Sequence, residues 1–303
     1  MSKITFKPKQ VTRRLLSVLP EKARDIVSKR FGLSEQGVRM TLEAIGSSYG
    51  ITRERVRQIE QAGLSAIKAS FVWEEVMPAF ENLRAILEEY GRGVAHEGDF
   101  LAHAAEDESM QNHVHFFLVL GEDFQRLKED ENFHHRWVAN RNVSDKVHEA
   151  LRALTQSLKS EDLLTDEQVL AEFSKYLTQE LRRVSDEKVL TRWLALSKRI
   201  GKNPLGDWGS ADSANIRTRG VRDLAFLVLR KRHEPLHFAE VAKEITKRFG
   251  RPAHLATCHN ELIKDKRFVL IGRGLYGLAE WGYRPGTVRE IIEEILKEHG
   301  PLT

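Results

Sequence analysis

The sequence predicts a mainly α protein: an N-terminal helix-turn-helix followed by a tandem array of winged-helix domains, each of three helices plus a β-hairpin. Two observations carry this prediction. The stretch TLEAIGSSYGITRERVRQIE, residues 41–60, has the pattern of two short helices around a tight turn. Farther along, Trp137, Trp208 and Trp281 are spaced 71 and 73 residues apart, and each ends a segment of the same layout.

Length and composition narrow the class of protein. A chain of 303 residues is long enough for two or more domains, and 41% hydrophobic with 30% charged residues is typical of a soluble, helix-rich protein. We find no secretory signal, and the longest apolar run, residues 116–120, is too short to span a bilayer. The single cysteine, Cys258, excludes an internal disulfide framework and fits a reducing cytoplasm.

The net charge of +4 conceals three blocks of opposite sign. Residues 1–70 carry a net charge of +8, residues 71–216 carry −10, and residues 217–282 carry +7. This layout suggests two ends that face a polyanion around a middle that DNA would repel. The alternative is that each block is only a solvated face.

The first 40 residues predict a basic arm and two helices. Residues 1–12 have no clear periodicity, so we expect a frayed arm. Apolar residues then recur at helical spacing on both sides of Pro20, which can open the second helix because its missing N–H is harmless there. Gly32 ends that helix. The apolar positions are Leu15, Leu16, Leu19, Ala23, Ile26, Val27 and Phe31.

The next stretch has the residues that a helix-turn-helix needs. Thr41 caps a helix over 42–49, Gly50 supplies the turn, and Thr52 caps a helix to about Ser70. Gly46 is the small residue where the second helix crosses the first. The predicted inner face consists of Ile45, Ile51, Val56 and Ile59.

The outward face of the second helix carries side chains that read DNA. Arg53 and Arg57 can fork onto guanine, Glu54 can accept from cytosine N4, and Gln58 can bridge adenine. Arg55 and the helix N-terminus suit phosphates. The alternative is a charged surface helix that carries Glu/Arg pairs.

The phrases LPEKARDIVSKRFGL and TLEAIGSSYGITRERVRQIEQAGLSAIK resemble region 4 of the sigma-70 family of bacterial transcription initiation factors, over residues 14–70. The resemblance implies that Arg53, Glu54, Arg57 and Gln58 recognise a −35 promoter element. It also implies that the first two helices dock on the flap of the RNA polymerase β subunit, and the candidate polymerase-binding residues are Leu15, Leu16, Leu19, Ile26 and Phe31. Two departures stand out. Ala62 and Ser65 replace basic residues usual in the family, and no stretch resembles region 2, which melts and reads the −10 element.

The remainder divides at the tryptophans into units of three helices and two short strands. The predicted domains are 1–75, the helix-turn-helix; 76–141 and 142–215, two acidic winged helices, the second with a reduced wing; 216–284, a basic winged helix; and 285–303, the start of a fourth unit. Because this last unit stops where its second helix should begin, we expect residue 303 to end a fragment. For the acidic units we favour spacing or protein contact over DNA binding.

The third winged helix carries a second resemblance. PLHFAEVAKEI and RFVLIGRGLYGLAEW are similar to a HARE-type winged helix, as in the delta subunit of bacterial RNA polymerase. Lys264 and the wing residue Arg273 are its candidate DNA contacts. Its other basic residues are Arg230, Lys231, Arg232, Lys243, Lys247, Arg248, Lys266 and Arg267. The alternative is a domain that docks on protein and has a solvated basic surface.

Three further patterns predict no chemistry. The glycines of 272–277 match G-x-G-x-x-G, but the residues after them continue as strand, so no helix N-terminus faces a pyrophosphate. The pairs His113/His115 and His134/His135 lack the partners of a metal site, so we expect solvent or interface histidines. Cys258 is a small packed residue. We predict no catalytic residue, metal or cofactor.

The leading hypothesis is a cytoplasmic, nucleoid-associated transcription factor that binds double-stranded DNA and RNA polymerase core, without a melting region. One rival is an adaptor that docks on the polymerase flap and hardly reads DNA. The other is a module of a DNA-modifying enzyme, whose catalytic motif would lie beyond residue 303.

Overall fold

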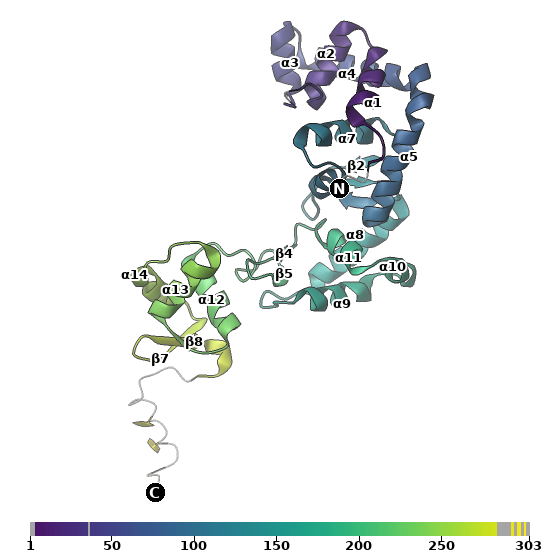
Figure 1. Cartoon of the computed structure of the whole chain (residues 1–303). Helices are drawn as coiled ribbons and strands as arrows, with labels where there is room; N and C mark the ends of the chain where they lie inside the picture. Colours follow the sequence, from purple (N-terminus) through teal and green to yellow (C-terminus); the bar gives the residue numbers. More distant parts are fainter. Residues whose placement is uncertain (1–3, 36, 284–291, 294–295, 298–299, 301–303) are drawn as a thin grey trace. The chain divides into compact units, whose positions relative to one another are not determined.

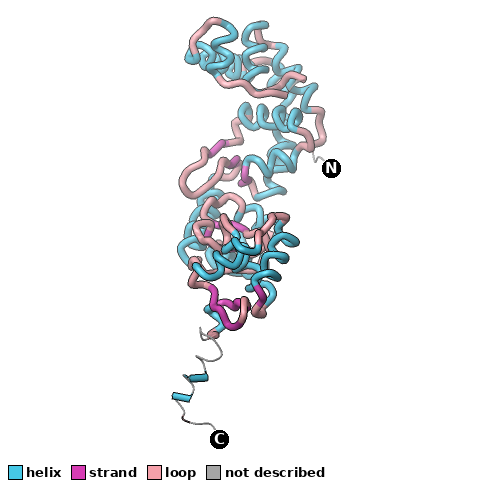
Figure 2. Tube along the Cα trace, turned by 90° about the vertical axis from the view of Figure 1, so that its left-hand side faces the viewer, coloured by secondary structure: helices cyan, strands magenta, loops and turns pink. Residues whose placement is uncertain are grey.

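The computed structural model describes residues 4–35, 37–283, 292–293, 296–297 and 300. The predicted fourth unit, 285–303, therefore lies mostly outside the described residues. Helices dominate and the strands are short (Figures 1 and 2), which confirms the mainly α prediction. Two compact units form, one from Met1–Leu154 with Leu170–Lys198, the other from Thr155–Val169 with Arg199–Thr303. The segment 142–215, predicted as one domain, contributes to both.

The first unit begins with the predicted helix-turn-helix, preceded by a helix longer than expected. Its first helices are α1 (Pro8–Ser17), α2 (Glu21–Phe31), α3 (Leu42–Tyr49) and α4 (Arg53–Lys68). The prediction of a frayed arm over 1–12 is wrong where residues are described, because α1 starts at Pro8 and Phe6 packs edge-on against Phe117 at 5.5 Å. That aromatic partner lies more than a hundred residues away, so local periodicity could not indicate it.

The first winged helix follows directly. It consists of α5 (Phe71–Gly91), β1 (Val94–His96), α6 (Glu97–Ala104), α7 (Glu108–Leu120), β2 (Gln125–Leu127) and β3 (Arg136–Val138). The antiparallel sheet has the order β1-β3-β2. Trp137 on β3 is buried, as expected of a residue that closes the unit. The first helix was predicted from Glu81 but begins at Phe71 and continues through Pro78.

Four more helices close the first unit: α8 (Arg141–Ser157), α9 (Asp166–Tyr176), of which Leu170 onward belongs here, α10 (Gln179–Val184) and α11 (Glu187–Leu194). The buried indole of Trp193 donates to the Gly91 carbonyl oxygen at 2.9 Å and ties α11 to the end of α5. Over the described ranges, no helix is both long and apolar enough to cross a membrane.

The second unit contains the basic winged helix. Its elements are β4 (Ile200–Lys202), β5 (Trp208–Ser210), α12 (Val221–Arg232), β6 (Leu236–His237), α13 (Phe238–Phe249), α14 (Leu255–Lys264), β7 (Phe268–Gly272), β8 (Leu275–Leu278) and the 3-10 turn η1 (Ala279–Trp281). The winged helix's sheet has the order β6-β8-β7. The predicted strand thus ends at Leu278 and a single turn follows, so the G-x-G-x-x-G glycines lead into this turn and not into an α-helix.

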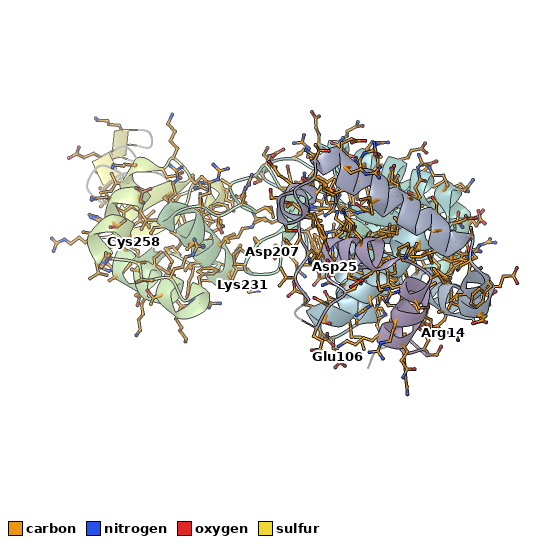
Figure 3. All side chains as sticks on the ribbon, turned by 90° about the horizontal axis from the view of Figure 1, so that it is seen from above. Arg14, Asp25, Glu106, Asp207, Lys231 and Cys258 are labelled. Atoms are coloured by element: carbon orange, nitrogen blue, oxygen red, sulfur yellow. The ribbon has the colours of Figure 1, made fainter. Side chains whose placement is uncertain are left out.

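Two side chains of the second unit face inward. Cys258 is buried in the core, as predicted (Figure 3). Arg267, counted among the basic residues of a possible DNA surface, instead donates to buried Asp223 at 2.9 Å and to Asp265 at 2.7 Å. Because both hydrogen bonds are charge-assisted, Arg267 serves the fold of this domain.

Candidate nucleic-acid interface

The turn between α3 and α4 is built as the sequence predicts. Thr41 Oγ1 accepts from the Ala44 amide at 3.1 Å, and Thr52 Oγ1 accepts from the Arg55 amide at 3.2 Å. Gly50 has φ of 63°, in the left-handed region that glycine adopts without strain. A Cβ on Gly46 would lie 2.7 Å from the Ile51 carbonyl oxygen, so a hydrogen is required where the two helices cross.

A small apolar core holds the two helices together. Ile26, Ile45 and Val56 are fully buried and form one cluster. Ile51 and Ile59 pack against it, together with Met40, Leu42 and Tyr49. This confirms the predicted inner face and fixes which side of α4 points outward.

Polar contacts that sequence reasoning missed brace this core from outside. The Tyr49 hydroxyl donates to Asp25, which also pairs with Lys29 at 2.6 Å. Arg30 pairs with Glu60 at 3.5 Å and thereby ties α2 to α4. Burial raises the pKa of Glu60 despite this arginine. Charged residues of α2 and α4 were visible in the sequence, but only the tertiary structure pairs them.

The outward face of α4 presents every side chain that was predicted to meet DNA at this helix. Thr52 and the side chains of the first two turns are exposed: Arg53, Glu54, Arg55, Arg57 and Gln58. The N-terminus of a helix also directs unpaired amides outward, which favours phosphate. The structure therefore gathers the charged and amide groups at one helix end.

Within this face the side chains hold one another in place. Arg57 donates twice to Glu54, at 2.8 and 2.5 Å, and Arg55 donates to Gln58 at 3.1 Å. The hydrogen bonds from Arg57 lower the pKa of Glu54, which keeps this exposed carboxylate ionised. These pairs are solvent-exposed, so they orient the groups without a large energetic barrier to exchange for base edges.

The five residues implied as polymerase contacts lie in the core. Leu15, Leu16, Leu19, Ile26 and Phe31 are all buried. Ile26 belongs to the helix-turn-helix cluster, and Leu19 lies against Gly63 of α4. Phe31 packs against Phe116 of α7 with ring centroids 5.1 Å apart. Any polymerase contact in this conformation would therefore use the exposed neighbours of these residues.

The two candidate DNA contacts of the second unit are exposed. Arg273 lies at the tip of the β7–β8 hairpin, where Gly274 has φ of 72°. Lys264 ends α14. The same helix also exposes Leu255 and Ile263, which give its outer side an apolar character. Thr41 and the α4 residues thus come together in one unit, whereas Arg273 and Lys264 belong to the other.

The histidine pairs do not form a metal site. Where residues are described, no group of three or more His, Cys, Asp or Glu could hold a metal ion. His113 and His115 are buried, and His113 Nδ1 lies 2.8 Å from Thr12 Oγ1 at the contact between α7 and α1. The interface half of the sequence prediction fits this pair, and the solvent half does not.

Comparisons with known proteins agree with the two resemblances. A family model described as "Sigma-70, region 4" matches residues 15–69. The model of the HARE-HTH family, described as a "restriction endonuclease HTH domain" among other sources of the domain, matches residues 219–281. Both are DNA-binding, non-catalytic families. No solved structure matches the chain.

Among curated proteins, RNA polymerase sigma factor RpoS of Coxiella burnetii is 47% identical over 55 residues, 18% of this chain and 15% of that protein. The chloroplastic sigma factor sigF of Arabidopsis thaliana is 45% identical over 56 residues, 18% of this chain and 10% of its own length. SigA1 of Synechococcus elongatus is 37% identical over 78 residues, 26% and 16%. The chain spans about a sixth or less of these relatives. It is therefore similar to sigma-70 region 4 and to a helix-turn-helix domain of the second family, over separate segments.

Proposed function

We propose that this protein is a DNA-binding transcription factor of the sigma region 4 type that recognises a −35-like promoter element and associates with RNA polymerase core. The observation that carries the proposal is the exposed N-terminal face of α4, held by the glycine-dependent crossing at Gly46. Arg53, Glu54, Arg57 and Gln58 read the bases, and Arg55 and Thr52 approach phosphates. Thr41 stabilises the preceding helix. These residues act without a melting region of their own, in the cytoplasm on the nucleoid.

Arg53→Ala and Glu54→Ala are each expected to weaken binding to a duplex with a TTGACA-like element by about 1–3 kcal/mol, and to leave a scrambled duplex unaffected. Fluorescence anisotropy across a salt series measures both affinities. Arg55→Ala should instead weaken both duplexes alike, because a phosphate contact carries no sequence information. Arg84→Ala, an exposed arginine of α5, serves as the control. Equal losses on both duplexes for Arg53→Ala would reject base reading.

The second candidate function is a polymerase adaptor with little DNA reading. The observation that favours it is the later half of α4, where Ala62, Ser65 and Ala66 are exposed and no cation follows Arg57 until Lys68. A shorter basic face gives a weaker hold on the DNA backbone. Retention of polymerase binding by a variant that binds neither duplex would favour the adaptor.

The basic winged helix is proposed to add backbone contacts through Lys264 and Arg273. Arg273→Ala is expected to lower the slope of log affinity against log salt concentration by about one on a duplex long enough to reach both units. Lys175→Ala, which removes an exposed lysine paired with Glu172, provides the matched control. An unchanged slope would assign the domain to protein docking, which the exposed Leu255 and Ile263 would suit.

A further inference from the structure

Helix α7, the third helix of the first winged helix, is buried on all sides. Seven consecutive residues, Asn112 to Leu118, are buried, and a helix buried around its whole circumference has partners on opposite faces. One face meets its own domain, where His115 lies 5.8 Å from Trp137. The other meets α1 and α2. The helix that a winged helix would offer to a DNA groove is thus covered.

The contact with α2 combines aromatic packing with a polar clamp. The Phe31 ring packs edge-on against Phe116. Just beyond α2, Asn112 Nδ2 donates to the Gly32 carbonyl at 3.2 Å and to the Gly37 carbonyl at 2.7 Å. Its Oδ1 accepts from Arg39 Nε at 2.6 Å. One amide side chain therefore holds the connection between α2 and α3 against α7.

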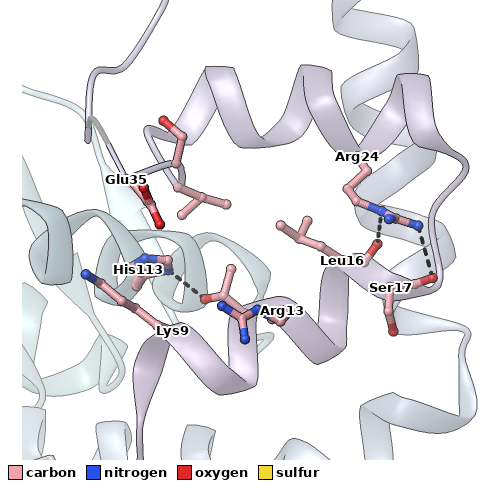
Figure 4. A pocket seen from close by; sticks show the side chains of 10 residues that line it. Lys9, Arg13, Leu16, Ser17, Arg24, Glu35 and His113 are labelled. Carbon is pink, nitrogen blue, oxygen red and sulfur yellow. Dashed lines mark hydrogen bonds between the residues drawn. The ribbon is translucent and has the colours of Figure 1, made fainter.

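The contact with α1 is polar and loosely packed. The Thr12–His113 contact crosses it, beside Leu16 (Figure 4). A cavity of about 310 Å³ opens on this seam, lined by Lys9, Glu35 and His113 among others. Cores are packed without such voids, and polar pairs need less apolar contact to be re-formed with water. The seam therefore has the composition of a docked surface that can separate.

We propose that the α1–α2 face around Phe31 is a docking surface for an apolar, aromatic helix, that α7 occupies it within the chain, and that the polymerase flap binds there only when α7 leaves. This rests on the proposed association with polymerase and deepens it. The implied flap contacts and the observed burial of Phe31 are then two states of one surface. Flap affinity is reduced by the fraction of molecules in which the surface is open.

Two variants shift this equilibrium in opposite directions. Thr12→Cys with His113→Cys, in a Cys258→Ala background that removes the single native thiol, places two cysteines at contacting positions and locks α7 when oxidised. Asn112→Asp keeps the acceptor for Arg39 but sets a carboxylate against two carbonyl oxygens, which favours opening. The full chain is used throughout, with circular dichroism as the folding control.

The probe is the isolated flap domain of the RNA polymerase β subunit, titrated by calorimetry. The oxidised double-cysteine protein should bind roughly tenfold or more weakly than the same protein reduced, and Asn112→Asp should bind roughly tenfold more tightly than wild type. Equal binding by the oxidised and reduced forms overturns the proposal. So does the absence of flap binding from both the reduced form and folded Asn112→Asp.

Binding to the TTGACA-like duplex is measured on the same samples. The α4 face lies outside the α7 seam, so the lock should leave DNA affinity unchanged. Failure of sequence discrimination in wild type would sink the proposed promoter reading while the comparison of oxidised and reduced flap binding still decides the role of α7.

Discussion

Lowering the pH from 7 to 4 is expected to destabilise the first unit by several kcal/mol. Burial lowers the pKa of His113, His115 and His148 from 6.5 to about 4. The unfolded chain therefore binds more protons than the native one between these values. The stabilisation is complete above pH 6.5 and is lost as the pH falls toward 4, at most about 3 kcal/mol for each histidine.

The groups around these histidines act in the same direction or only partly against it. Lys9 opposes protonation of His113 while Asp107 favours it. His115 faces Arg39, Arg126 and Arg30 against Glu97, and His148 faces Arg136 and Arg152 against Asp145 and Asp130. In addition, His148 Nε2 accepts a hydrogen bond from Arg136 Nε at 2.9 Å, which protonation would remove.

Urea unfolding of the full chain at several pH values, followed by tryptophan fluorescence, measures this acid dependence. His148→Gln should reduce it by about one proton, because glutamine can accept from Arg136 but does not titrate in this range. His254→Gln, at an exposed position, should leave it unchanged. A free energy of unfolding that stays constant from pH 7 to 4 would contradict the expected neutral, buried histidines.

Replacing Gly46 by valine is expected to cost about 3 kcal/mol and to abolish DNA recognition. The new Cβ would stand 2.7 Å from the Ile51 carbonyl oxygen, and backbone atoms cannot rotate away as a side-chain end can. The helices α3 and α4 must then separate, which moves Arg53 and Glu54 away from their common face. Both the thermal midpoint and affinity for the TTGACA-like duplex report the effect.

Gly98→Ala supplies the matched control in the same unit. Its Cβ would meet only the His96 ring, at 3.4 Å, and alanine is the better helix former. Stability and DNA binding should stay at or above the wild-type level. Normal DNA binding by a folded Gly46→Val protein would show that the crossing does not position the recognition face.

Local signals in the sequence determined the helix-turn-helix. The caps Thr41 and Thr52, the left-handed Gly50 and the inner apolar positions act within a few residues of one another. The α12 bounds, 221–232, were predicted to the residue for the same reason: an apolar helix followed by a short polar break is a local pattern. Because these signals need no distant partner, the sequence alone located the candidate DNA-reading face.

Other errors came from contacts that are distant along the chain. Arg267 looked like one more surface cation, yet Asp223 lies 44 residues away in sequence and draws it inward. The residues before Arg14 had no helical periodicity, yet Phe117 gives Phe6 an aromatic partner. Charge and periodicity describe a segment without its neighbours, so they could not reveal either pairing.

The sequence by itself determined the recognition helix, the array of helices and short hairpins, and the two family resemblances. Only the tertiary structure decided that α7 covers Phe31 and that Asn112 clamps the loop after α2. The physical reason is that an apolar helix face must be buried, but its own pattern does not say by what. Here the partner within the chain comes about 80 residues later, and it occupies the face that the resemblance assigns to polymerase.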